Sequence, residues 1–163
     1  MNHAERYLDL IARCPKRLDS QYYAAFYLLS ADPEVYEAAK THIDAVGIHF
    51  TKIRRAIDNA AEKKRCVVQA AHSLFGSAGA TTRAPTPYEI SQLGAPLIGA
   101  AVTAMLICGE QVQVEVFTNA EGKPAFDIDT SNYYRNCRFN DGFVNMGTEY
   151  RQDREADEDG LDR

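Results

Sequence analysis

A charge-free stretch of about 20 residues, from position 90 to position 109, constrains the fold of this chain more than any other feature. Thr86 and Glu89 before it have the spacing of a capping box, and Pro87 stands at the first helical position, so a helix is predicted to begin here. Gly109 predicts its end. Polar residues, glycine and proline dilute the stretch, which favours a core helix buried nearly all round over a membrane anchor, the weaker alternative.

Pro96 and a row of small residues predict the shape and packing of this central helix. Pro96 removes one helical hydrogen bond, so the helix should bend or break near Gly94, and we expect a kinked helix. Small side chains recur every four residues and predict that a neighbouring backbone approaches closely, either in the core or in a dimer. These residues are Ser91, Ala95, Gly99 and Thr103.

Five helices are predicted before the central helix, and a Gly-rich flexible connector is predicted over residues 76–85. Apolar residues recur at helical spacing in five runs, at residues 4–14, 20–30, 33–46, 48–58 and 63–75. Asp32 and Pro33 predict the start of the third run. Its inner stripe is expected to contain Val35, Ala39, Ile43 and Val46.

After the central helix the apolar period changes from helical to two, which predicts a β-hairpin with one apolar face. The expected register sets Val114 opposite Ile128 and Glu115 opposite Asp127. Like charges placed opposite each other destabilise a strand pair, so this acidic face is expected in water or against something positive. The aromatic residues from Tyr133 onward predict one more irregular or short-strand segment. Together these patterns predict an α+β fold.

Composition predicts one globular domain with an acidic tail. The chain has 163 residues, of which 45% are hydrophobic and 25% charged, and its net charge is -5. Residues 149–163 contain seven acids and three arginines, so we predict a domain over 1–148 and a charged tail over 149–163. The near-neutral remainder argues against a dominant nucleic-acid surface. The N-terminus is unlike a signal peptide, and four scattered cysteines are typical of a reduced, cytoplasmic protein.

The sequence contains no catalytic or cofactor motif, and no catalytic residue can be named. Acidic side chains on the hairpin, Glu115, Asp127 and Asp129, could hold a divalent cation through oxygen ligands. Such a site would make the chain a metal-dependent enzyme, which is one alternative. A small-molecule sensor is another, with a pocket between the central helix and an aromatic helix. The aromatic residues expected to line that pocket are Tyr22, Tyr23, Phe26 and Tyr27.

Two basic clusters are predicted on the fourth and fifth helices. They could meet a phosphate backbone or an acidic partner, but Asp58 and Glu62 interrupt them and favour solvated helix faces. The clusters consist of Lys52, Arg54 and Arg55, and of Lys63, Lys64 and Arg65.

The leading hypothesis is a non-enzymatic interaction module, an accessory or inhibitor protein that binds a positively charged partner protein. Acidic groups can mimic a phosphate backbone and compete for its binding site. The acidic tail and the acidic face of the hairpin are expected to contact the partner. The tail residues expected to do so are Glu155, Asp157, Glu158 and Asp159.

Two sequence stretches carry a resemblance. They are FYLLSADPEVYEAAKTHID at 26–44 and RCVVQAAHSLFG at 65–76. Over residues 21–76, about a third of the chain, the sequence resembles small uncharacterised proteins encoded on mobile elements of gut Firmicutes, although it lacks their tryptophans. The resemblance implies no activity and assigns no functional residue.

Overall fold

The computed structural model describes residues 1–16, 18–76 and 83–138. Helices and two small antiparallel sheets make up this part of the chain, which confirms the predicted α+β class.

The chain divides into two compact units, Met1–Asp129 and Thr130–Arg163. The predicted boundary between residues 148 and 149 and the acidic tail lie outside the described residues. Within the second unit, residues 131–138 are helical, so the predicted irregular or short-strand segment at Tyr133 is wrong.

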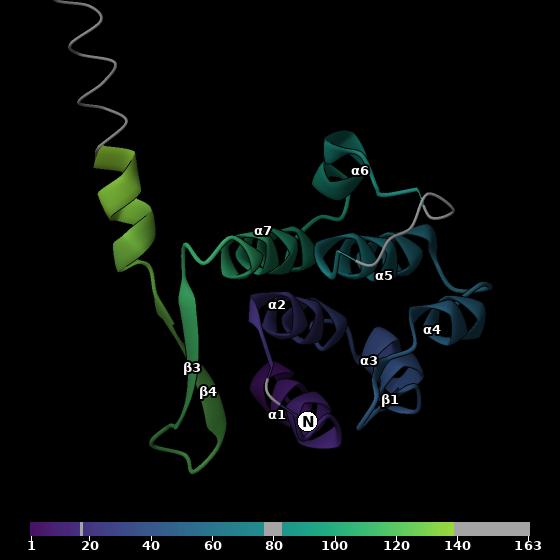
Figure 1. Ribbon diagram of the computed structural model, residues 1–163, viewed down its shortest axis with the longest axis horizontal. Coiled ribbons are helices and arrows are strands. Elements are labelled where there is room, and N and C mark those ends of the chain that lie inside the picture. The colour runs from purple at the N-terminus through teal and green to yellow at the C-terminus, as the bar shows by residue number, and fades with distance from the viewer. Residues whose placement is uncertain (17, 77–82, 139–163) are drawn as a thin grey trace, which may run out of the picture. The chain divides into compact units, whose positions relative to one another are not determined.

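Three helices open the first unit, and aspartate or asparagine caps each of them. They are α1 (His3–Arg13), α2 (Ser20–Leu29) and α3 (Pro33–Lys40) (Figure 1). The side chains of Asn2, Asp19 and Asp32 accept hydrogen bonds from backbone N–H groups in the first turns, as N-caps do. The predicted starts of the second and third helices are therefore confirmed.

The third helix ends earlier than its apolar spacing predicts. After α3 the chain forms a short hairpin of β1 (Ile43–Asp44) and β2 (Gly47–Ile48). The Asp44 side chain accepts hydrogen bonds from the backbone N–H groups of Val46 and Gly47, and Gly47 adopts φ +147°. Val46 is 77% exposed, so its predicted place on an inner helical stripe is wrong. The turn chemistry of Asp44 and Gly47 overrides the apolar spacing.

The core forms around α2, which packs against α1, α5 (Glu62–Leu74) and α7 (Leu97–Cys108). Six consecutive residues of α2, from Ala24 to Leu29, are buried. The remaining helix of this region, α4 (Phe50–Ala56), buries Phe50 and Ile53 and packs against α5. This arrangement leaves the opposite face of α4 available for polar side chains.

The predicted central helix is broken into α6 (Pro87–Ser91) and α7. The predicted capping box between Thr86 and Glu89 is present, and Gly109 caps the end of α7. Between the two helices, Gly94 adopts φ +73° and the Ala95–Pro96 peptide bond is cis. The expectation of a kinked helix is therefore wrong, and the alternative of a break near Gly94 is confirmed.

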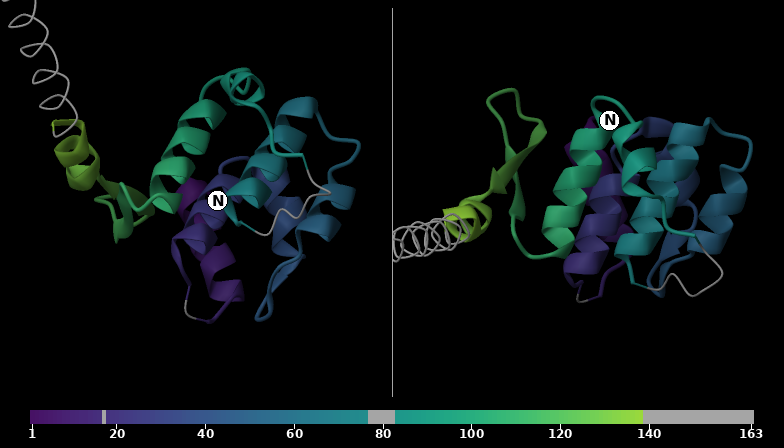
Figure 2. Two further views of the ribbon diagram at one scale, coloured as in Figure 1. Left: turned by 45° about the horizontal axis from the view of Figure 1, so that its top comes forward. Right: turned by 90° about the horizontal axis from the view of Figure 1, so that it is seen from above.

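The broken helix is also more exposed than predicted. Only Ala101, Ala104 and Ile107 of α7 are buried, Val102 is 48% exposed, and α6 buries no residue. In Figure 2, α2 and α5 lie along one side of α7, so the other side of this helix is exposed. A Cβ atom added to Gly99 would meet nothing within 4 Å, so the close approach predicted in the core is wrong at Gly99, and the alternative of a dimer stays a prediction. No helix in the described ranges is long and apolar enough to cross a membrane.

The predicted hairpin is present as β3 (Gln113–Thr118) and β4 (Pro124–Asp129). Val114 pairs with Ile128 and Glu115 with Asp127, which confirms the predicted register. The Phe126 ring contacts the rings of three residues on α1 and α2. The ring-centroid distances are 4.8 Å to His3, 5.5 Å to Tyr7 and 5.1 Å to Tyr27. These contacts hold the apolar face of the hairpin against the helices.

Candidate functional site

The hairpin presents an acidic surface on the face opposite Phe126. Glu115 and Asp127 lie directly across from each other, and both are exposed. Because side chains alternate along a strand, the packing of Phe126 and Ile128 turns Asp127 outward. We call Glu115 and Asp127 the acidic pair.

The acidic pair lacks the geometry of a metal site. Asp129, the third predicted ligand, pairs with Gln113 rather than with Glu115. Among the residues that the structure describes, no group of three or more His, Cys, Asp or Glu side chains could hold a metal ion. The metal site of Glu115, Asp127 and Asp129 therefore stays a prediction without geometric support.

The four aromatic residues predicted to line a ligand pocket have different surroundings. Phe26 is fully buried and Tyr27 is 6% exposed, so both belong to the core. Tyr22 packs edge-on against Phe75 at a centroid distance of 4.7 Å. Tyr23 is 37% exposed and lines a cavity of about 300 Å³ beside the start of β3. Tyr22 and Phe26 are four residues apart and their ring centroids lie 5.8 Å apart, whereas Tyr23 points to another side of the helix. The predicted partner residues, Glu155, Asp157, Glu158 and Asp159, lie outside the described residues.

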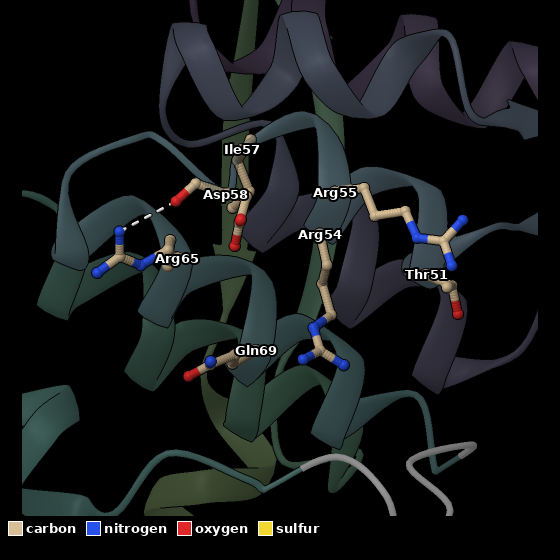
Figure 3. A pocket seen from close by; sticks show the side chains of 7 residues that line it. All are labelled: Thr51, Arg54, Arg55, Ile57, Asp58, Arg65 and Gln69. Carbon is tan, nitrogen blue, oxygen red and sulfur yellow. Dashed lines mark hydrogen bonds between the residues drawn. The ribbon is translucent and has the colours of Figure 1, made fainter.

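A cavity of about 290 Å³ between α4 and α5 is lined by three arginines (Figure 3). Both Arg54 and Arg55 reach it from α4, Arg54 from beside the buried face of that helix and Arg55 from its exposed side. Arg65 reaches it from the first turns of α5. Figure 3 shows Gln69 between the side chains of Arg54 and Arg65 in this view.

Hydrogen bonds to the α4–α5 connection hold the Arg65 guanidinium in place. Its Nη1 atom donates to the backbone oxygen of Asp58 at 3.2 Å and to that of Ala60 at 2.9 Å. The planar fork of a guanidinium has further N–H donors on Nε and Nη2. Arg65 is thus both a structural residue of this connection and a positioned cation at the cavity.

A second cavity, of about 510 Å³, continues from the first between α5 and α6, and Arg65 and Gln69 line both. It adds Lys63, Arg83 and Tyr88, and the Tyr88 side chain is 72% exposed. Glu62 and Glu89 also line it.

Glu89 is engaged in local contacts at this second cavity. The backbone N–H and the hydroxyl of Thr86 donate to its carboxylate at 2.7 and 2.9 Å, and Arg83 lies 3.2 Å away. The hydrogen bond from the Thr86 backbone is the largest cause that lowers the pKa of Glu89. Glu89 therefore stays ionised while its oxygens are taken up by the start of α6.

A third cavity, of about 440 Å³, adjoins the first on the side of α4, and Thr51 and Arg55 line both. It is also lined by Lys52 and by His72, whose ring stacks on Phe50 at a centroid distance of 4.4 Å. Burial, and then the charge of Arg54, lowers the pKa of His72. The ring is therefore neutral near pH 7.

The three cavities adjoin one another through shared lining residues, and we call their combined lining the basic groove. Its cations are Lys52, Arg54, Arg55, Lys63, Arg65 and Arg83. The sequence identifies two basic clusters but favours solvated helix faces for them. It contains no signal that α4 and α5 would lie side by side, or that Arg83 and Tyr88 would join them, because these contacts depend on tertiary packing.

Comparison of the chain with models of protein families, with curated proteins and with solved structures gives no match. Its function is therefore argued from the geometry of its own residues.

Proposed function

We propose that this chain is a non-enzymatic interaction module whose hairpin binds a positively charged segment of a partner protein. The observation that carries the proposal is the acidic pair, in which exposed Glu115 and Asp127 lie opposite each other. Like charges in this arrangement destabilise a strand pair. A lysine or arginine of a partner placed between them would relieve that repulsion, and complementary charge speeds association and selects the partner.

The anchoring of the hairpin supports the proposal. Phe126 packs among the rings of His3, Tyr7 and Tyr27, so the acidic face is held outward on a fixed support. A rigid binding surface loses less conformational entropy on association than a mobile one. The acidic residues of 149–163 would add further negative charge for such a partner.

A lysine-rich peptide, decalysine, tests the proposal by fluorescence anisotropy with the purified full-length chain. We expect binding that weakens as salt rises, because exposed charges are screened. Glu115→Gln with Asp127→Asn should weaken binding. The matched control, Glu34→Gln with Glu37→Gln, removes two acids from α3 and should leave binding unchanged. Equal losses of affinity in the two double variants would show that the hairpin has no special part in binding.

The tail requires its own variant. Deleting residues 149–163 separates its contribution from that of the acidic pair. If the deletion leaves the affinity for decalysine unchanged, the tail plays no part in binding. The partner itself can be sought by pull-down from a lysate of the source cell, followed by elution with moderate salt and mass spectrometry.

A further inference from the structure

We infer that the basic groove binds single-stranded nucleic acid, with backbone phosphates on its arginines and one base stacked on Tyr88. This inference is independent of the proposed function, because the groove and the acidic pair share no residue.

Each of the three cavities is concave, and residues of α4, α5 and α6 line them. Shared residues connect the cavities in pairs, namely Thr51 with Arg55 and Arg65 with Gln69. The surface therefore follows α4, crosses α5 and reaches α6. An extended chain can contact all three cavities at once, whereas a single small anion would occupy only one of them.

Positive charge exceeds negative charge along the groove. Six lysines and arginines line it, against three acids, Asp58, Glu62 and Glu89. Glu89 already accepts hydrogen bonds from Thr86 and lies beside Arg83. The basic groove is thus locally cationic although the chain has a net charge of -5. Phosphates of a nucleic-acid backbone bind such surfaces by releasing their counterions.

The arginines fit phosphate in particular. A guanidinium presents a planar fork of donors that matches two oxygens of a phosphate, and it is more weakly hydrated than an ammonium group. Arg65 is held in place by the bonds from Nη1 to the backbone oxygens of Asp58 and Ala60. Its Nε and Nη2 donors therefore approach an anion in a fixed orientation, which reduces the entropy lost on binding.

Tyr88 distinguishes nucleic acid from an acidic protein segment. Its ring is 72% exposed at the start of α6 and shares a cavity with Lys63, Arg65 and Arg83. An aromatic ring beside cations is the arrangement that binds unpaired bases, because any base can stack on the ring while the cations hold the backbone. A carboxylate-rich peptide has no group that would use the ring in this way. Bases in a duplex are already stacked, which favours a single strand.

Fluorescence anisotropy with the full-length chain and a labelled oligothymidylate of about 20 nucleotides tests the inference, starting at about 50 mM salt. We expect binding whose affinity falls as salt rises. Arg54→Gln with Arg55→Gln should weaken binding at least about tenfold and reduce the slope of log K against log salt by about 1.4, that is, by about 0.7 for each phosphate that an arginine no longer neutralises. Tyr88→Ala should weaken binding at least about fivefold.

The matched control is Lys40→Gln with Lys123→Gln, which removes two cations outside the groove and should leave the affinity unchanged. Circular dichroism should show unchanged melting for each variant. If the arginine variant does not fold, Lys63→Gln with Arg83→Gln replaces it. These two side chains line the groove but do not belong to α4, so their replacement leaves the packing of that helix unchanged.

Three outcomes would overturn the inference. The first is no binding of the oligonucleotide at low salt. The second is an equal loss of affinity in the control and groove variants. The third is that labelled decaglutamate binds as tightly as the oligonucleotide and that Tyr88→Ala does not change the affinity for either. This result would identify the groove as a site for acidic protein segments. If decalysine does not bind, the proposed function of the hairpin is wrong, but the inference about the basic groove is unaffected.

Discussion

Glu115 lies directly across the β3–β4 ladder from Asp127, and both carboxylates are exposed. Replacing Glu115 by lysine converts a repulsive pair into an attractive one, so Glu115→Lys should raise the free energy of unfolding by about 0.2–1 kcal/mol. Urea denaturation followed by circular dichroism measures the change. Adding Asp127→Lys restores like charges and should remove the gain. If the double variant is as stable as Glu115→Lys, the pair does not interact.

The same substitution separates stability from binding. If the acidic pair contacts a basic partner, Glu115→Lys should weaken decalysine binding while it stabilises the protein. A variant that gains both stability and affinity would contradict the proposed role of the pair.

Phe126 and Phe117 lie on opposite strands of the hairpin and differ in burial. Phe126 packs among three rings, whereas Phe117 is 50% exposed. Phe126→Ala should lower the free energy of unfolding by about 2 kcal/mol, less than for a fully buried ring, because Phe126 is only partly buried. Phe117→Ala should change it by no more than about 0.5 kcal/mol. Urea unfolding of both variants measures the difference, and similar effects would mean that Phe126 does not anchor the hairpin.

Arg6 is a buried cation that satisfies backbone oxygens. It is 8% exposed and donates to the backbone oxygens of Ser30 at 2.7 Å, Ala31 at 3.1 Å and Met1 at 2.7 Å. Arg6→Met should lower the free energy of unfolding by about 3 kcal/mol, because buried acceptors lose their donor. Arg13→Met on the same helix breaks an exposed ion pair with Asp9 and an exposed hydrogen bond to the backbone oxygen of Lys40, and should cost no more than about 1 kcal/mol. Urea unfolding of both variants compares them, and equal effects would contradict this account of Arg6.

Two histidines predict a loss of stability on mild acidification. Burial is the largest cause that lowers the pKa of both His3 and His72. Below the usual histidine pKa of about 6.5, the unfolded chain binds protons that the folded protein does not. The free energy of unfolding should therefore fall as the pH decreases through about 6.5.

His72→Phe isolates one of these histidines, because phenylalanine keeps a ring against Phe50 but binds no proton. The loss of stability between about pH 7.5 and about pH 5.5 should be smaller in this variant than in the unmodified chain. Urea unfolding at both pH values measures it, and an identical loss would exclude His72 as a contributor. Asp9 and Asp44 have lowered pKa values, so they change the free energy of unfolding only in a separate, more acidic range of pH.

The local features of this fold could be predicted from the sequence because neighbouring residues determine them. Asp32 with Pro33 begins a helix and Thr86 with Glu89 forms a capping box, since the groups that meet are within three residues of each other. The hairpin register was equally predictable, because alternation restricts the arrangements that place Val114 and Ile128 on the same face.

The predictions from apolar spacing are wrong where turn chemistry or packing competes with that spacing. Asp44 and Gly47 end the third helix before Val46. The positive φ of Gly94 and the missing backbone N–H of Pro96 break the central helix, and only one side of α7 is then covered by α2 and α5. A charge-free run specifies that burial is favourable, but the number of faces that are buried depends on how many neighbours the fold supplies.

The sequence by itself determined the α+β class, most helix starts and the acidic hairpin face, all of which depend on contacts within one element or between adjacent strands. Only the tertiary structure decided the basic groove. Arg54 and Arg65 come from different helices, and Arg83 and Tyr88 join them only because α6 lies against α5. Long-range packing brings such residues together, and no local pattern of charge or hydropathy records it.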